Sequence, residues 1–269
     1  MNSFKIPDMN DVFCKQHDFI DGYCVGTING YDGLHLICQE TQTAKRLPDE
    51  YQETPIYLSP NCGGYSDGLI MVSLMGEFKL AYFHEKSGCA GLWGWVDKDF
   101  NVVIEPQYIF AENFYNGIAL VSKGKWIPAD NGRHAWENEA WGIINKQGDE
   151  ILPCIYDELN EIGNSENLFL AHKGGWENGN LCVVNSDTKE EILQLPFDFD
   201  TGYMFNEMFV DENNLIFINH LAGEGSDLLY VYNLESKTFL LYAEPYTERT
   251  INGQDKIVIE KDGQTIIVF

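Results

Sequence analysis

Short apolar runs rich in β-branched and aromatic residues recur along the whole chain, and polar turn residues separate them. No segment shows a sustained helical period with caps at both ends. Runs of this length, bounded by Gly, Asn, Asp and Ser, are typical of β-strands. The pattern therefore predicts an all-β fold. Representative runs are WGWVD (93–97), NVVIEP (101–106), GIALVS (117–122), LCVVN (181–185) and TIIVF (265–269).

The chain also repeats itself. LWGWVDKDFNVVIEPQY (92–108) returns as WGIINKQGDEILPCIY (141–156), and YSDGLIMVS (65–73) returns as FYNGIALVS (114–122). Repeats of this length are the signature of stacked or radial architectures. Weaker echoes at 34–51, 181–198 and 229–242 extend the series to five candidate units. We predict one β-repeat domain over residues 1–269, with units near 22–80, 81–125, 126–175, 176–220 and 221–269.

These residues resemble the WG-repeat family. Its units read approximately as Trp-Gly-aromatic-Ile-Asp, a turn with glycine, a strand ending in proline, a Tyr-Asp pair, and Phe-x-x-Gly-Leu-Ala-x-Val. The resemblance covers about residues 65–160 and implies tandem β units, without implying one activity. The matching positions are Gly68, Leu69 and Val72; Trp93, Gly94, Trp95, Val96, Asp97, Pro106, Tyr108, Phe114, Gly117, Ala119 and Val121; and Trp141, Gly142, Ile143, Ile144, Asn145, Gly148, Pro153, Tyr156 and Asp157.

The geometry of a β-strand explains why tryptophan and glycine stand next to each other. Alternate residues share a face, so Trp93 and Trp95 are expected to pack together against a neighbouring unit. A glycine between them suits a place where another backbone comes close. Pro106 and Pro153 are expected to end their strands, because proline cannot donate to a ladder. Five such units predict a five-bladed propeller-like array, with an open twisted β-repeat stack as the alternative.

Charge is the most unusual property of the composition. Forty-two Asp and Glu residues against 17 Lys and Arg give a formal net charge of −25. Such a surface repels nucleic acid and anionic membranes, and it attracts basic proteins. The same acidity would also serve solubility alone. We expect a basic protein as the partner, and neither nucleic acid nor membrane; the oligomeric state stays open.

Motifs for catalysis or ligand binding are missing from the sequence. The six histidines lack metal-ligand spacing, and no glycine-rich phosphate loop is recognisable. We expect no enzyme activity, no cofactor and no metal site. The seven cysteines form no C-x-x-C pair and sit mostly in apolar runs, which predicts free thiols. With no signal peptide or membrane span recognisable in the sequence, a cytoplasmic location is expected.

Acidic residues concentrate between the predicted strands, where stacked units would align them into one negative surface. The sharpest hypothesis is an immunity protein that neutralises a toxin, most naturally a nuclease with a cationic active site. A generic WG-repeat interaction module or a glycan-binding module is the alternative, and a hydrolase with paired carboxylates is a third. The candidate partner-binding residues are Glu137, Glu139, Asp149, Glu150, Asp157, Glu158, Glu161, Asp187, Glu190, Glu191, Trp136 and Trp176.

Overall fold

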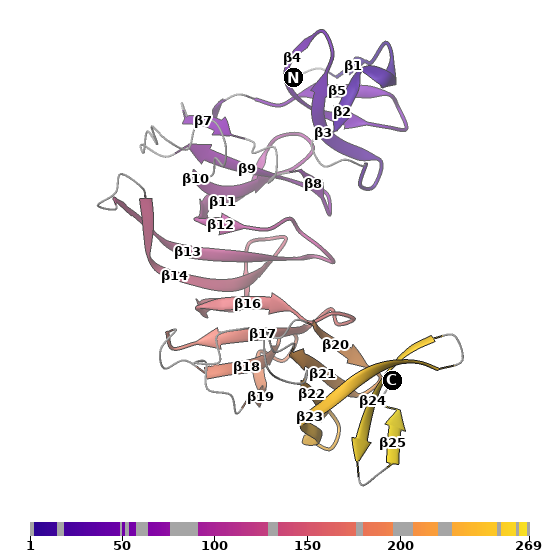
Figure 1. Ribbon diagram of the computed structural model, residues 1–269. Helices are drawn as coiled ribbons and strands as arrows, with labels where there is room; N and C mark the ends of the chain where they lie inside the picture. The colour runs from indigo at the N-terminus through magenta and orange to yellow at the C-terminus, as the bar shows by residue number, and fades with distance from the viewer. Residues whose placement is uncertain are drawn as a thin grey trace. The chain divides into compact units, whose positions relative to one another are not determined.

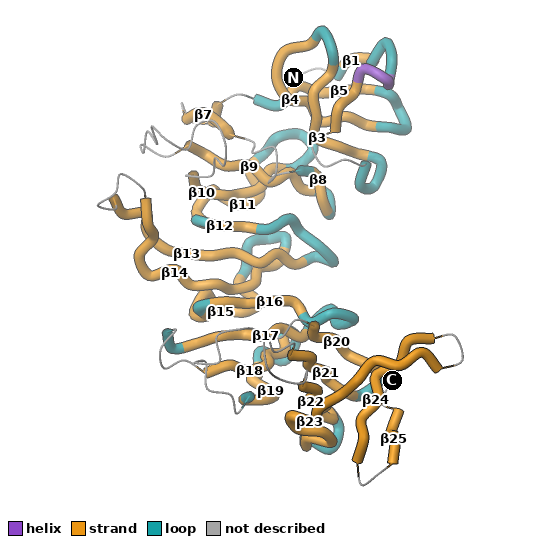
Figure 2. Tube along the Cα trace, viewed as in Figure 1, coloured by secondary structure: helices purple, strands orange, loops and turns teal. Residues whose placement is uncertain are grey.

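The computed structural model confirms the all-β prediction (Figures 1 and 2). Among the described residues there is no α-helix, and the single helical turn is the 3₁₀ segment Met9–Asp11. The chain divides into two compact units, Met1–Glu158 and Leu159–Phe269, and each is described by itself. The structure describes residues 3–14, 19–48, 50–51, 54–57, 64–75, 91–128, 134–175, 180–195, 207–219, 228–251, 254–261 and 264–267.

The first unit contains three antiparallel sheets. One has the order β1-β5-β4-β3-β2, with β1 Phe4–Lys5, β2 Val12–Cys14, β3 Tyr23–Ile28, β4 Tyr31–Cys38 and β5 Thr43–Arg46. The next has the order β11-β10-β9-β7-β6 with β8 beside β9, comprising β6 Glu50–Tyr51, β7 Thr54–Tyr57, β8 Tyr65–Ser66, β9 Leu69–Met75, β10 Gly91–Val96 and β11 Val102–Tyr108. The third has the order β12-β13-β14-β15, comprising β12 Phe110–Ala111, β13 Ile118–Pro128, β14 His134–Asn145 and β15 Glu150–Tyr156.

The second unit contains two antiparallel sheets. The four-stranded sheet runs in chain order through β16 Glu158–Glu161, β17 Leu168–Lys173, β18 Asn180–Asn185 and β19 Glu190–Gln194. The six-stranded sheet also runs in chain order, through β20 Glu207–Asp211, β21 Asn214–Asn219, β22 Leu228–Asn233, β23 Thr238–Ile251, β24 Gln254–Lys261 and β25 Gln264–Ile267. None of the five sheets closes on itself, so tandem β repeats are confirmed as the fold class.

Each sheet contains the same three-stranded meander, and two turns meet at one end of it. A tight turn leads into the first strand. In the first unit its two central residues both have positive φ, as at Asp67 with Gly68 and Asn116 with Gly117. Asn and Asp tolerate this backbone better than other non-glycine residues. Ile118, which follows one such turn, pairs with Asn145, which opens the turn between the second and third strands. We call this edge of each sheet the turn end.

The second turn is held by an Asp or Asn side chain at the end of the middle strand. Asp97 accepts the backbone N–H groups of Asp99 and Asn101 at 2.8 and 2.9 Å. Asn145 accepts those of Gln147 and Asp149, both at 2.9 Å. This side-chain mimicry of a backbone turn explains why the sequence repeats Asp or Asn at that point. Asn185 and Asn233 accept turn N–H groups in the second unit in the same way.

Trp93 and Trp95 at the first Trp-Gly pair lie in the core, as predicted, whereas Trp141 of the second pair is half-buried. Trp93 and Trp95 are 2% and 1% exposed, and their cluster includes Phe114 and Val121 from the next sheet. The Trp95 ring lies 5.1 Å from that of Phe114. Indole rings therefore pack one repeat against the next within the first unit.

The prediction that proline ends its strand is wrong. Pro106 lies inside β11 and Pro153 inside β15. Tyr108 and Tyr156 end those strands and are buried. The reason is a β-bulge: the register shifts opposite each Trp-Gly pair, which lets β11 pass a residue without a free N–H.

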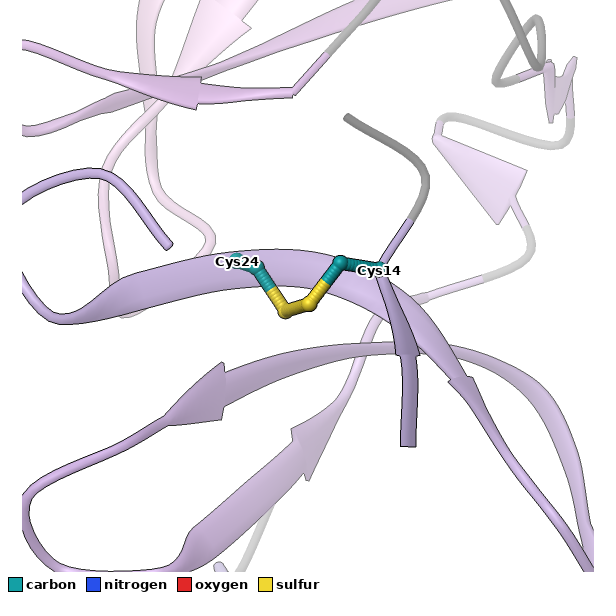
Figure 3. Close-up of a disulfide and its surroundings, with 2 residues drawn as sticks. All are labelled: Cys14 and Cys24. Atoms are coloured by element: carbon teal, nitrogen blue, oxygen red, sulfur yellow. A yellow bond between two sulfur atoms is a disulfide. The ribbon is translucent and has the colours of Figure 1, made fainter. Parts of the chain in front are cut away.

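The first sheet also corrects the expectation for the cysteines. Cys14 of β2 and Cys24 of β3 form a disulfide (Figure 3), so the prediction of free thiols throughout is wrong. Cys24 is buried among Ile28, Ile37 and Ala44. Apolar neighbours in the sequence therefore did not distinguish a cysteine in a disulfide from a free thiol. Cys38, Cys154 and Cys182 are free, whereas Cys62 and Cys89 lie outside the described residues. Burial raises the pKa of the Cys154 and Cys182 thiols to about 11.

The five sequence intervals and the single domain stay predictions. Each hydrogen-bonded meander begins at a turn end, with first strands at β3, β9, β13, β17 and β21. The intervals predicted from the sequence follow the positions of the Trp-Gly motifs instead of the turn ends.

Candidate functional site

The predicted acidic residues fall into separate groups. In the first unit, Asp149 and Glu150 lie at the turn end of the third sheet. At the opposite end, Asp157 and Glu158 follow Tyr156, which pairs with Trp141. Glu137 and Glu139 lie beyond that pair, on a hairpin extension. The second unit carries Glu161 at the end of β16, Asp187 in a turn, and Glu190 with Glu191 on β19. A single surface over all ten therefore stays a prediction.

The turn end of the first unit is acidic but partly neutralised. Glu150 accepts from Lys123 Nζ at 2.6 Å, and this hydrogen bond raises the pKa of the Lys123 ammonium. Asp99 binds Lys45 Nζ at 2.9 Å while its side chain stays 81% exposed. Exposed ion pairs of this kind contribute about 0–1 kcal/mol each, so these carboxylates remain open to a stronger partner.

Three further acids at this end were missed by sequence reasoning. Asp21 precedes β3, Glu40 follows β4, and Asp99 follows β10; all three are exposed. The signal was present, because each occupies a turn equivalent to one already recognised in the Trp-Gly units. Aligning the turns rather than the tryptophans would have found them.

The third sheet also carries a two-stranded ribbon. β12 pairs with Val121 and Ser122, and β15 pairs with β14 only from Trp141 onward. Residues 123–128 and 134–140 therefore pair only with each other among the described strands. Glu137 is exposed on this ribbon, and Glu139 is half-buried at its root.

Glu139 has an unusual environment for an acid. Trp141 Nε1 donates to its Oε1 at 3.0 Å, and the Trp141 ring stacks on Phe110 at 6.0 Å between centroids. Burial raises the pKa of the Glu139 carboxyl, and the hydrogen bond from Trp141 offsets part of that rise.

In the second unit the acids surround the turn between β18 and β19. Asp187 accepts from Asn167 Nδ2 at 2.7 Å, and Glu191 lies 3.5 Å from Lys173 Nζ. Glu190 and Glu161 are exposed.

The two tryptophans among the candidate residues are Trp136 and Trp176. Trp136 pairs with Trp126 in the backbone register of the ribbon, and Trp176 lies outside the described residues.

Comparison with known proteins agrees with this geometry. No curated protein matches the chain. The family described as WG containing repeat matches residues 93–125 and 141–175. Over these two segments the chain is similar to WG repeats.

Each matched WG repeat crosses from one sheet to the next. The first begins in β10 and ends in β13, so it joins the last two strands of one meander to the first strand of the following one. The second runs in the same way from β14 to β17. The first repeat therefore carries a contact between two sheets of the first unit within its own sequence, and Trp93 and Trp95 lie at that contact.

The described part of the chain carries neither a metal-ligand cluster nor a membrane-spanning helix. No group of three or more His, Cys, Asp or Glu side chains there could hold a metal ion. Within the same residues, no helix has the length and apolar character needed to cross a bilayer.

Proposed function

We propose that this WG-repeat protein is a non-enzymatic module that binds a basic protein, and most specifically an immunity protein that neutralises a toxin nuclease domain. The WG repeats support the coarser part, a repeat-containing module for protein interaction. The observation that carries the finer part is the charge: pairing every Lys and Arg with one acid would still leave an excess of 25 carboxylates.

The placement of those carboxylates supports a cationic partner. Glu40, Asp99 and Asp149 are exposed in the turns of three successive sheets of the first unit. Hydrogen bonds from backbone N–H groups fix the turns that carry Asp99 and Asp149. Fixed charges at an open edge steer a partner of opposite charge and raise its association rate.

The proposal places the protein in the cytoplasm, where a nuclease would reach its nucleic acid. Cytoplasmic reductants would there favour thiols at Cys14 and Cys24 over the disulfide.

The test needs a cationic protein with a nuclease-like domain encoded next to the gene for this chain; if the neighbouring genes encode none, the toxin hypothesis fails at this first step. Binding is measured by surface plasmon resonance from 50 to 500 mM NaCl, and nuclease activity is measured with the WG-repeat protein added in equimolar amount. We expect binding that weakens steeply with salt, because screening shortens the range of the charges, together with loss of nuclease activity.

Matched variants separate charge from shape. Neutralising four exposed acids (Glu40→Gln, Asp149→Asn, Glu161→Gln and Glu190→Gln) is expected to lower the association rate about tenfold at low salt. The charge-preserving control (Glu40→Asp, Asp149→Glu, Glu161→Asp and Glu190→Asp) should associate at the wild-type rate. Binding that is absent, or unaffected by salt and by the neutral variant, would refute the proposal.

A further inference from the structure

We propose that residues 3–14 form a strap that the Cys14–Cys24 disulfide holds against one face of the first sheet, and that reduction of this disulfide by a dithiol lets the strap open. The first unit would then contain a redox-sensitive cover over an apolar sheet face. This inference does not depend on the proposed function, and its test needs only the protein itself.

The strap crosses the sheet from one edge to the other. β1 pairs with β5 at one edge, and β2 pairs with β3 at the other. Between these two strands, Ile6 and Met9 pack in the apolar cluster of Ile28 and Ile37. The other face of β3 and β4 packs against the second sheet, for example through Val25. On its own face the strap therefore takes the position that a neighbouring sheet takes on the other.

The hydrogen bonds that hold the strap are few. β1 is two residues long and β2 is three, whereas strands usually have about 3–10 residues. The Ile6 N–H donates to the Gln42 carbonyl oxygen, and the Asn29 N–H donates to the Asp11 carbonyl oxygen, both at 2.9 Å. Because these pairings are short, the covalent bond between β2 and β3 is a substantial part of what keeps the strap closed.

The disulfide joins the end of the strap to the face that the strap covers (Figure 3). Cys24 is 1% exposed and belongs to the apolar cluster, whereas Cys14 is only partly buried. The two cysteines are 10 residues apart in sequence. A cross-link of this kind lowers the conformational entropy of the open state, because the strap cannot move far from β3. Reduction restores that entropy and so favours opening.

The reduction transfers two electrons from a dithiol to the protein. A thiolate of the dithiol bonds to Cys14 Sγ, in the more exposed of the two cysteines, and the bond between the two protein sulfurs breaks. Cys24 leaves as a thiolate and takes a proton from water. The second thiolate of the reductant then displaces Cys14, which also takes a proton, and the reductant is left as a disulfide. Oxidised glutathione reverses the reaction and is itself reduced to two thiols.

The test is amide hydrogen exchange of the full chain, followed by NMR after treatment with oxidised glutathione or with dithiothreitol. The amides of Ile6 and Asn29 report on the strap, since both take part in its hydrogen bonds. We expect them to exchange at least about thirtyfold faster in the reduced protein, a factor that corresponds to the lower part of the range for disulfide stabilisation. Residues 141–156 of the third sheet should exchange at the same rate in both states.

Two variants assign the effect to this disulfide. Cys14→Ser should exchange at the fast rate under both conditions. Cys38→Ser, which removes a free thiol of the same sheet, should respond to reductant as the wild type does. Circular dichroism and the thermal midpoint establish that each variant is folded.

Three results would overturn the inference. The first is equal exchange of Ile6 and Asn29 in oxidised and reduced wild-type protein. The second is an equal acceleration at residues 141–156, which would mean that reduction loosens the whole unit and not the strap. The third is a response to reductant that persists in Cys14→Ser. The proposed function is tested by partner binding and would stand in each case.

Discussion

Gly94 and Gly142 are the residues that the Trp-Gly pair depends on sterically. A Cβ at Gly94 would lie 2.5 Å from the Ile104 carbonyl oxygen and 2.6 Å from the Pro106 nitrogen. At Gly142 it would lie 2.7 Å from the Leu152 carbonyl oxygen. Both neighbours are backbone of the bulged third strand, which cannot turn aside as a side chain can. The bulged strand can therefore approach this closely only where the facing residue is a glycine.

Gly94→Ala should accordingly destabilise the protein by about 2–3 kcal/mol, the cost typical of overpacking a buried site. Urea unfolding followed by tryptophan fluorescence measures it, since Trp93 and Trp95 lie beside the substitution. Gly30→Asn is the control, because nothing lies within 4 Å of its Cβ position and Asn tolerates its φ of +81°. Equal stability of the two variants would contradict the steric argument.

Glu139 allows a prediction about pH. Its pKa is raised chiefly by burial, so the folded state holds its proton more tightly than the unfolded state does. The stability contribution of the protonated carboxyl is full below the unfolded pKa and is lost as pH rises through the folded pKa. Glu139→Gln, which keeps an oxygen for Trp141, should therefore unfold at higher urea concentration than the wild type at pH 8.

That difference should shrink as the pH falls toward 4, where the wild-type carboxyl is protonated too. Glu137→Gln controls for the removal of one charge from the same strand, because Glu137 is exposed and lies two residues away. A Glu139→Gln advantage that grew on acidification would show that the sign is wrong.

For single residues, the sequence predicted which side chains are buried better than it predicted which residues they face on the neighbouring strand. Alternation placed Trp93 and Trp95 on one face correctly. The prolines were misjudged because a bulge opposite each Trp-Gly pair lets β11 and β15 continue past Pro106 and Pro153. A bulge inserts a residue without a local sequence signal, so the register had to come from the structure.

At the scale of elements, the turn ends connect successive repeats. Asp67 Oδ2 accepts the backbone N–H of Gly117 at 2.6 Å, and the Asp67 carbonyl oxygen accepts from Lys146 Nζ at 2.6 Å. Ser66 Oγ donates to the Phe114 carbonyl oxygen. The Asp67 carboxylate is therefore used to hold one sheet to the next and does not belong to a partner surface.

Asp67→Asn tests this connection, because asparagine keeps the positive φ of 51° but carries no charge for the Gly117 N–H. We expect a loss of about 1–2 kcal/mol in unfolding free energy, the difference between a hydrogen bond to a charged acceptor and one to a neutral acceptor. Asp21→Asn is the matched control at the same turn of the first sheet, with φ of 50°. Amide hydrogen exchange at Gly117 should accelerate in the Asp67 variant alone; unchanged exchange there would contradict the role of the carboxylate.

At the scale of the whole molecule, the dominant quantity is the net charge of −25. The amino-acid composition gives this net charge directly. Among the sequence features, the net charge alone pointed toward a basic partner. The positions of the acids could not be predicted, because their grouping depends on which turns the meander brings to the same end. Asp149 and Asp157 are only eight residues apart, yet the third sheet places them at its opposite ends. A sequence reading that stacked all acidic loops on one face could not have separated them.

Self-repulsion among these carboxylates should also limit the stability of the isolated protein. Raising NaCl from about 10 mM to 500 mM shortens the Debye length from about 30 Å to less than 10 Å, so repulsion between distant acids should fade. The exposed ion pairs at Lys45, Lys123 and Lys173 weaken at the same time but contribute little each. We therefore expect the thermal midpoint to rise by several degrees. The neutral variant at Glu40, Asp149, Glu161 and Glu190 should start from a higher midpoint and rise less. A midpoint that falls with NaCl would mean that ion pairs outweigh repulsion, and the excess charge would then no longer be a burden that a basic partner relieves.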